Sequence, residues 1–281
     1  MLVSLKPILK KAYAEKYAVG AFNVSNTLFA QTVLEAAEEL NSPLILQVTE
    51  KTLRMTGLTK FAEMLVALSK TSRIPIGLHF DHGEDPATAK ELLDIGFTSI
   101  MMDYSALPFS FNLKKTKELA EFAHTRGATI EGEVGRVAGQ EDYILQKKIV
   151  YTDPAQAEIF VKETGIDVLA VSFGNAHGKP QPGEKLDFEL LKTINERLKM
   201  PLAFHGASGT KPEDMERAIS LGISKVNIDT DLKHTVTLAI KQYLREHPEC
   251  DDPREYLTYA AHAIKEVVMN KIALFGSLNK A

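Results

Sequence analysis

Residues 76–83 read IGLHFDHG, a short apolar run that ends on an acidic residue, a histidine and a glycine. A run of this kind is typical of a buried strand whose last residues reach a polar edge. The segment before it has helical spacing, and Pro75 marks the break between the two. The chain around this stretch repeats the same order of helix, break, apolar strand and polar strand end.

Eight candidate strands follow this pattern. They lie at residues 19–23, 44–49, 76–81, 99–103, 128–134, 168–174, 202–206 and 225–229. Eight alternating units predict a (β/α)8 barrel, the TIM barrel, as a single domain over residues 1–281. A doubly wound parallel sheet has the same alternation and stays open on pattern alone. The number of units and the polar residues at the strand ends favour the barrel.

The composition and net charge limit which partners the protein can be expected to bind and in which compartment it can be expected to lie. The 281 residues carry a formal net charge of -4, which argues against nucleic acid and anionic membranes as partners. Cys250 is the only cysteine, so an intramolecular disulfide and a multi-cysteine zinc site are excluded. The N-terminus lacks the apolar core of a signal peptide, and no apolar run reaches membrane-spanning length. The expected location is the cytoplasm.

Three histidines, His82, His177 and His205, follow separate predicted strands. Barrel enzymes carry their chemistry at these strand ends, and three imidazoles suit zinc while leaving one position open for a substrate oxygen. A lone histidine is more often an ordinary hydrogen-bonded side chain, but three at equivalent positions favour a zinc site.

Asp81 precedes His82, and neighbouring strand residues point to opposite faces. Both can serve one site only where the strand ends, and Gly83 is expected to supply that break. Asp81 is a candidate base for a substrate hydroxyl, or else a carboxylate that orients a zinc-bound histidine. His79 lies two residues deeper and is expected in the barrel interior.

Glycines and small polar residues follow the last three strands, at 177–179, 205–209 and 227–230. Their backbone N–H groups, with the Ser208 and Thr230 hydroxyls, predict a phosphate cradle in a place where barrels often have one. Tight turns alone are the plainer interpretation. The neighbouring histidines favour an anionic ligand.

Nearly the whole chain resembles the class II fructose-bisphosphate and tagatose-bisphosphate aldolases. The matching stretches are AFNVSN (21–26), LHFDHG (78–83), MMDYS (101–105), EGEVGRVAGQED (131–142), FGNAHGK (173–179), FHGASG (204–209), KVNIDTDL (225–232) and LFGSLNKA (274–281). The resemblance implies reversible cleavage of a ketose bisphosphate to dihydroxyacetone phosphate and an aldehyde.

The resemblance also implies a role for particular residues. It makes His82, His177 and His205 the Zn2+ ligands, with Asp103 and Glu133 at a secondary metal position. It assigns the proton on the C4 oxygen to Asp81 and the proton at C3 to Glu141, in a loop after the fifth strand. The substrate-binding residues that it implies are Asn23, Gly178, Gly206, Ser208, Asn227, Asp229 and Thr230. It further implies a monovalent cation, Na+ or K+, and a homodimer or homotetramer.

Departures from the family pattern lie where the aldehyde half of the substrate is expected, at residues 49–52 (TEKT), 103–106 (DYSA) and 258–266 (TYAAHAIKE). Fructose 1,6-bisphosphate, with glyceraldehyde 3-phosphate as the aldehyde, is the first expectation because Gly83 and the NIDTD run at 227–231 look fructose-type. Tagatose 1,6-bisphosphate is the second, and another phosphorylated ketose the third.

Three rival functions are weaker. A Schiff-base aldolase needs a lysine at a strand end, and no predicted strand ends on one, since Lys225 is expected to begin the eighth. A metal-dependent hydrolase predicts an HxH pair on the first strand, where residues 23–25 read NVS. A non-catalytic sugar-phosphate binding protein would need neither Asp81 nor the histidines.

Overall fold

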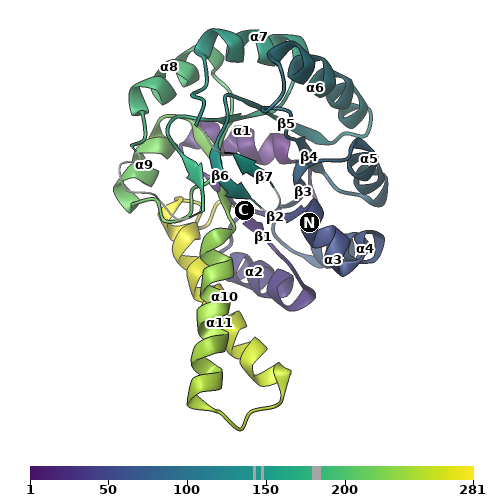
Figure 1. Ribbon diagram of the computed structural model, residues 1–281, viewed down its shortest axis with the longest axis vertical. Helices are drawn as coiled ribbons and strands as arrows, with labels where there is room; N and C mark the ends of the chain where they lie inside the picture. Colours follow the sequence, from purple (N-terminus) through teal and green to yellow (C-terminus); the bar gives the residue numbers. More distant parts are fainter. Residues whose placement is uncertain (142–143, 147–148, 179–184) are drawn as a thin grey trace.

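The strands of the chain close into a single barrel (Figure 1). The computed structural model describes residues 1–141, 144–146, 149–178 and 185–281. In barrel order the eight parallel strands are β1 (Val19–Asn23), β2 (Leu44–Thr49), β3 (Ile76–Gly83), β4 (Ser99–Met102), β5 (Thr129–Val134), β8 (Val168–Val171), β10 (Leu202–Phe204) and β11 (Ile223–Ile228). Every predicted strand is present, and the predicted barrel is confirmed.

Helices surround the barrel (Figure 1). They are α1 (Leu5–Glu15), α2 (Thr27–Glu39), α3 (Glu50–Thr56), α4 (Leu58–Thr71), α5 (Pro86–Ile95), α6 (Phe109–His124), α7 (Pro154–Thr164), α8 (Phe188–Leu198), α9 (Pro212–Ser220), α10 (Thr230–Glu246) and α11 (Pro253–Leu274). Local sequence sets several of these ends. Asn26 caps α2 by accepting a hydrogen bond from the backbone N–H of Phe29 at 2.9 Å. Gly165 ends α7 with a left-handed φ of 69°.

The barrel interior changes character along its axis. At the N-terminal ends of the strands, α1 packs across the opening, and Leu5 and Leu9 are fully buried in one apolar cluster with Val19 and Ile45. The first turn of α1 is tied to the start of β5, because Lys6 N donates to Thr129 Oγ1 at 2.9 Å. This end of the barrel is therefore closed. The polar interior residues lie toward the other end.

A small second sheet was not predicted. It consists of β6 (Ala138–Glu141), β7 (Ile144–Gln146) and β9 (Ala176–His177), with β6 between the other two. Gly139 pairs with His177 in the parallel register of β6 and β9. The segment after β5 is thus tied to the segment after β8, beside the barrel mouth.

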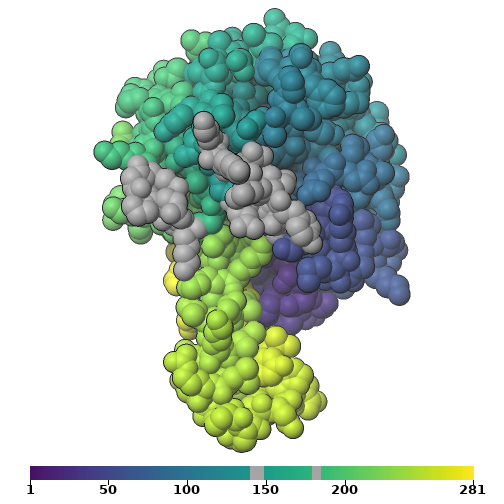
Figure 2. Space-filling model, in the orientation of Figure 1, coloured from purple at the N-terminus to yellow at the C-terminus, as the bar shows by residue number. Residues whose placement is uncertain are grey.

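The last two helices form an arm, α10 with α11, that projects away from the barrel (Figures 1 and 2). Its surface carries exposed apolar side chains, including Leu238 and Leu244, which are 52% and 38% exposed. Within the described residues, none of the helices combines the length and the apolar character that a membrane crossing needs.

Candidate active site

The three predicted metal-binding histidines meet at the C-terminal mouth of the barrel. One nitrogen from each of His82, His177 and His205 lies within 4.8 Å of the others. The shortest approach is 2.7 Å, between His82 Nε2 and His205 Nδ1. The rings are set edge to face, with centroids 4.7 Å apart for His82 and His205 and 5.3 Å apart for His82 and His177. Residues far apart in the sequence thus present converging imidazoles.

The surroundings of these rings favour a cation between them. In two of the three rings the far nitrogen faces a carboxylate: His205 Nε2 lies 2.6 Å from Glu131 Oε1, and His82 Nδ1 lies 3.5 Å from Asp103 Oδ2. When both rings are neutral and carry their protons on these far nitrogens, the facing nitrogens present lone pairs 2.7 Å apart. A divalent metal ion would accept both lone pairs. The donor set fits zinc.

Burial opposes protonation of His177 and His205, and metal-binding histidines must be neutral. Desolvation lowers the pKa of His177 to about 3, with a further contribution from His82. Desolvation also lowers the pKa of His205 well below its usual value, and the charges of His82 and Lys225 act in the same direction. Protons therefore compete weakly with a metal ion for these nitrogens.

The turn at the end of β3 differs from the prediction. The break in the strand lies at His82 itself, which has a left-handed φ of 46°, and not at Gly83. The pairing of β3 with β4 is irregular between Phe80 and Gly83. Gly83 is required for packing, because a Cβ there would lie 2.2 Å from the Phe80 ring. The left-handed residue allows Asp81 and His82 to serve one site.

Glu50 holds the turn that follows His82. Its Oε2 accepts hydrogen bonds from the backbone N–H groups of Glu84 at 2.7 Å and Asp85 at 3.0 Å. Arg54, one turn later in α3, pairs with the other oxygen of Glu50. A carboxylate at the start of α3 thereby fixes the turn that follows a candidate metal ligand.

A second group that could hold a metal ion combines His82 with Asp103 and Glu133, the predicted secondary position. Asp103 Oδ1 accepts from Ser105 N at 2.8 Å, and Glu133 Oε1 accepts from Val137 N at 3.1 Å. Burial opposes ionisation of Asp103, but the hydrogen bond and charge of His82 hold its pKa below the usual range. The structure thus brings these two carboxylates to the same histidine.

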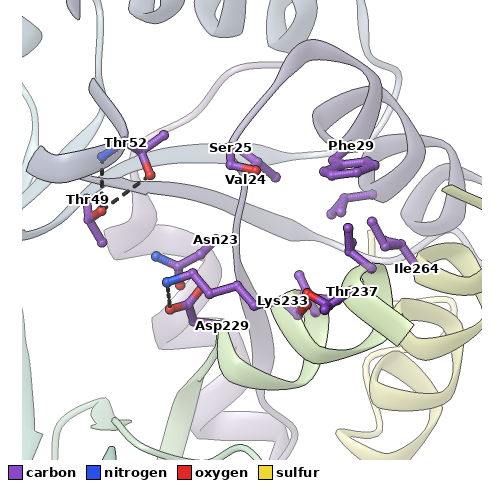
Figure 3. Close-up of a pocket in the computed structure, with 13 residues that line it drawn as sticks. Asn23, Val24, Ser25, Phe29, Thr49, Thr52, Asp229, Lys233, Thr237 and Ile264 are labelled. Carbon is purple, nitrogen blue, oxygen red and sulfur yellow. Dashed lines mark hydrogen bonds and ion pairs between the residues drawn. The ribbon is translucent and has the colours of Figure 1, made fainter. Parts of the chain in front are cut away.

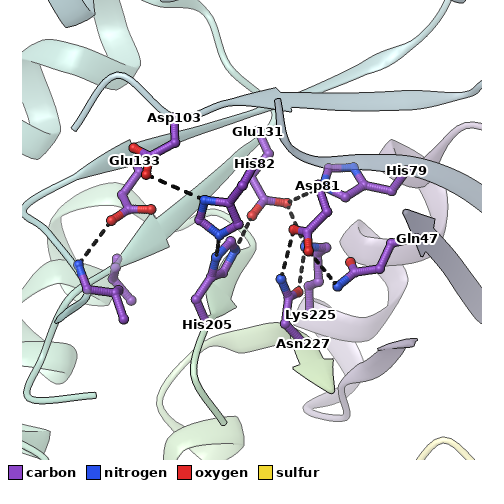
Figure 4. Close-up of polar contacts among 12 residues, drawn as sticks. Gln47, His79, Asp81, His82, Asp103, Glu131, Glu133, His205, Lys225 and Asn227 are labelled. Carbon is purple, nitrogen blue, oxygen red and sulfur yellow. Dashed lines mark hydrogen bonds and ion pairs between the residues drawn. The ribbon is translucent and has the colours of Figure 1, made fainter. Parts of the chain in front are cut away.

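Asp81 is fully buried beside the histidines and accepts three hydrogen bonds from side-chain amides (Figure 4). Asn23 Nδ2 and Gln47 Nε2 each lie 3.1 Å from its Oδ2, and Asn227 Nδ2 lies 3.1 Å from its Oδ1. Burial alone would raise the pKa of Asp81, but the charges of His82 and Lys225 and the hydrogen bond from Asn23 lower it below the usual value. Asp81 is held as a carboxylate that only accepts.

Sequence reasoning missed a set of polar residues in the barrel interior. Glu131 and Lys225 are both fully buried, and their charged atoms lie 3.0 Å apart. Lys225 is inside β11 and not at its start, which corrects the expected strand bounds. Gln47 also escaped notice, whereas His79 lies inside the barrel as expected and contacts Ser99 Oγ at 2.7 Å. Each of these strand residues lies two positions before a polar residue at a strand end, a signal that could have found them.

The expected phosphate-binding residues lie on neighbouring loops. Gly206 has φ 62°, and a Cβ there would lie 2.2 Å from the carbonyl oxygen of Ala176, so only glycine fits. Ser208 Oγ accepts from Asp231 N at 3.2 Å, which joins the loop after β10 to the start of α10. A cavity of 150 Å³ borders Gly206 and Ser208. Gly178, Asp229 and Thr230 complete the expected phosphate set, and Gly178 also has a positive φ, of 95°. Asn227, expected at the substrate hydroxyl or enediolate, lies in β11.

Glu141 is described only in part. Its backbone lies in β6, in register with Ile144 of β7. Its side chain lies outside the described residues. The structure therefore places the strand that carries Glu141, without bringing its carboxylate to a particular atom.

A larger cavity, of 200 Å³, opens beside the site between β1, α10 and α11 (Figure 3). Asn23, Thr49 and Asp229 border it on the polar side, and Lys233 pairs with Asp229. The apolar lining consists of Val24, Phe29, Val33, Leu232, Val236 and Ile264. Because Asn23 also donates to Asp81, this cavity adjoins the candidate base.

Comparisons with known proteins agree along the full chain. A sequence model of the family described as fructose-bisphosphate aldolase class-II matches residues 3–280. The fructose-bisphosphate aldolase of Geobacillus stearothermophilus is 42% identical over 284 residues, which cover 100% of this chain and 99% of the relative. That of Thermus caldophilus is 40% identical over 306 residues, with both chains covered in full. Among solved structures, the YdjI aldolase from Escherichia coli has a TM-score of 0.90 at 35% identity, again with both chains covered in full.

Proposed function

Because the chain belongs to the class II fructose-bisphosphate aldolase family, whose members are metal-dependent lyases, we propose that it cleaves fructose 1,6-bisphosphate with zinc as its metal. The products are dihydroxyacetone phosphate and glyceraldehyde 3-phosphate, and the reaction is reversible. The observation that supports this proposal most is the meeting of three imidazoles beside a buried carboxylate at the barrel mouth.

In the proposed reaction, one group of residues binds the metal ion and another residue transfers a proton. His82, His177 and His205 would hold the zinc ion, and Asp103 and Glu133 would form a secondary position around His82. Zinc, when bound, supplies a Lewis acid that stabilises the negative charge left when the C3–C4 bond breaks. Asp81 takes the proton from the C4 hydroxyl in the cleavage direction and returns it in synthesis.

Three amide donors suit Asp81 to this exchange. They orient both carboxylate oxygens, and the lowered pKa keeps Asp81 at neutral pH in the ionised form that a base needs. Glu141 is the proposed carrier of the proton at C3. In support, β6 pairs with β9, whose His177 is one of the proposed metal ligands.

We assign the phosphate of the dihydroxyacetone phosphate half to the loops after β9, β10 and β11. The residues of this proposed cradle are Gly178, Gly206, Ser208, Asp229 and Thr230, with Asn227 at the adjacent hydroxyl. The first turn of α10 begins at Thr230, and backbone N–H groups at a helix N-terminus favour an anion. A monovalent cation near the glycine loops, Na+ or K+, is part of the same proposal.

The aldehyde half is assigned to the 200 Å³ cavity beside Asn23. Two of the segments that depart from the family pattern contribute to its lining, through Thr49 and Ile264. Lys233 is the cationic residue of this lining and is a candidate partner for a distal phosphate. Fructose 1,6-bisphosphate is proposed ahead of tagatose 1,6-bisphosphate and of other phosphorylated ketoses, because Gly83 and the NIDTD run at 227–231 resemble the fructose-type members of the family.

The proposed assembly is a homodimer or homotetramer in the cytoplasm. Exposed Leu238 and Leu244 on the arm formed by α10 and α11 support association, because apolar groups of this kind are common at interfaces. The single cysteine, Cys250, supports a reducing compartment.

Release of triose phosphate from fructose 1,6-bisphosphate tests the function. Zinc-loaded protein is expected to release dihydroxyacetone phosphate, to lose this activity after EDTA and to regain it with added zinc. Release of inorganic phosphate instead would indicate a hydrolase, and tight binding without cleavage would indicate a binding protein. Full activity after complete metal removal would refute the proposed chemistry. The ratio of kcat/KM for fructose and tagatose bisphosphates then settles the preferred ketose.

A further inference from the structure

Lys225 is a buried lysine that the proposed chemistry does not use. It lies inside β11 with no exposed surface, near Glu131 and Asn227 (Figure 4). A fully buried ammonium group is costly unless charged and polar partners compensate it. Lys225 has two such partners: Glu131 Oε2 at 3.0 Å and Asn227 Oδ1 at 2.6 Å.

The first contact leads to a proposed metal ligand. Glu131 uses its other oxygen, Oε1, to contact His205 Nε2 at 2.6 Å. This contact turns His205 Nδ1 toward His82, the orientation that metal binding requires. Glu131 is itself fully buried, so the positive charge of Lys225 is what compensates its carboxylate. Lys225 therefore supports the orientation of His205 through Glu131.

The second contact leads to the proposed base. Lys225 can only donate, so the oxygen of the Asn227 amide must face it and the Nδ2 group must point the other way. That Nδ2 donates to Asp81 Oδ1 at 3.1 Å. If the amide turned over, its oxygen would face the carboxylate and the two acceptors would repel each other. Lys225 thus sets which end of Asn227 meets Asp81.

We propose that Lys225 is a positioning residue that aligns the metal ligand His205 and the base Asp81 at the same time. The inference rests on the proposed aldolase function. The contacts that carry this role are those with Glu131 and Asn227, and Lys225 is not part of the lining of the cavity beside Asn23. A single buried charge would in this way couple metal binding to proton transfer.

The test is Lys225→Met, with zinc affinity and kcat measured separately. Zinc affinity, from competition with a chromogenic chelator, is expected to fall about tenfold or more, as for other residues that orient metal ligands. At saturating zinc, kcat is expected to fall by a further factor of about ten, because the Asn227 amide loses its fixed orientation. Lys225→Arg, which keeps the charge, is expected to recover part of the zinc affinity.

Lys6→Met is the matched control. Lys6 is ion-paired with Asp167 at 2.7 Å near the closed end of the barrel, so this variant removes a lysine ion pair far from the histidines. It is expected to keep both zinc affinity and kcat. A folded Lys225→Met protein with both values within about threefold of the parent would overturn the proposal.

The double variant Glu131→Gln with Lys225→Met covers the case in which Lys225→Met does not fold. Replacing a buried ion pair by neutral groups of similar size is often tolerated, so this protein should fold. Its kcat at saturating zinc should stay about tenfold low, since Asn227 still lacks its donor. Parental kcat and zinc affinity in the double variant would mean that Lys225 only balances the charge of Glu131. Zinc affinity can be measured without any substrate, so a failed aldolase assay on the parent protein leaves this test intact.

Discussion

Replacing Asp81 with asparagine probes the proposed base with almost no change in shape. The carboxylate receives three hydrogen bonds, all from amide N–H groups, at 3.1 Å each. An asparagine offers one accepting oxygen and one donating NH2 group. At least one of the three surrounding donors then faces another donor and loses its partner.

The substitution is expected to lower both the free energy of unfolding and kcat. One frustrated donor costs about 1–3 kcal/mol of unfolding free energy, which lowers Tm by roughly 2–5 °C and leaves the fold intact. Loss of the base lowers kcat by about 10²–10⁴, which corresponds to roughly 2.7–5.5 kcal/mol in the barrier. Zinc affinity should change little, because the proposed zinc ligands are His82, His177 and His205, and Asp81 is not one of them.

Two assays on zinc-loaded Asp81→Asn protein separate the roles of Asp81. Cleavage of fructose 1,6-bisphosphate breaks the C3–C4 bond and needs a base for the C4 hydroxyl, so it should fall by at least a hundredfold. Exchange of the C3 proton of dihydroxyacetone phosphate with D2O breaks no carbon–carbon bond and should largely persist. Cleavage within about threefold of the parent rate would refute the assignment. Equal loss of cleavage and exchange would point instead to a disturbed metal site.

Two further outcomes follow from the geometry. In zinc-free protein, burial lowers the pKa of His177 to about 3, so the unfolded chain binds more protons below about pH 6.5. The free energy of unfolding should therefore fall as the pH drops from 6.5 toward 3, by up to about 1.4 kcal/mol per pH unit for this group. Urea titrations should show a shallower fall in His177→Asn. Glu50→Ala removes the acceptor of two backbone N–H groups after His82 and should cost about 3 kcal/mol of stability and weaken zinc binding, whereas Arg54→Ala should keep zinc binding at the parental level.

The sequence was a good guide to the barrel because each strand is a short apolar run with a polar end. The small sheet of β6, β7 and β9 escaped prediction for a physical reason. Its strands are two to four residues long, too short to show a period in hydrophobicity. Their pairing depends on where β5 and β8 end, which only the closed barrel determines.

The sequence predicted the residues of the candidate site that lie at strand ends, but not those that lie inside the strands. Polar residues at strand ends indicate chemistry, whereas the same residues inside a strand were taken for packing. Glu131 and Lys225 belong to the second kind, and their pairing joins β5 to β11 across the interior of the barrel. Alternation along each strand can place them on the inward face, but their 3.0 Å separation depends on the relative register of strands that are not neighbours.

The helix α1 leaves the barrel open only at its C-terminal mouth, because Leu5 and Leu9 fill the opposite end. A molecule that binds in the polar interior must therefore enter and leave through the C-terminal mouth of the barrel. Solvent, substrate and products therefore share one route, which passes the three converging histidines.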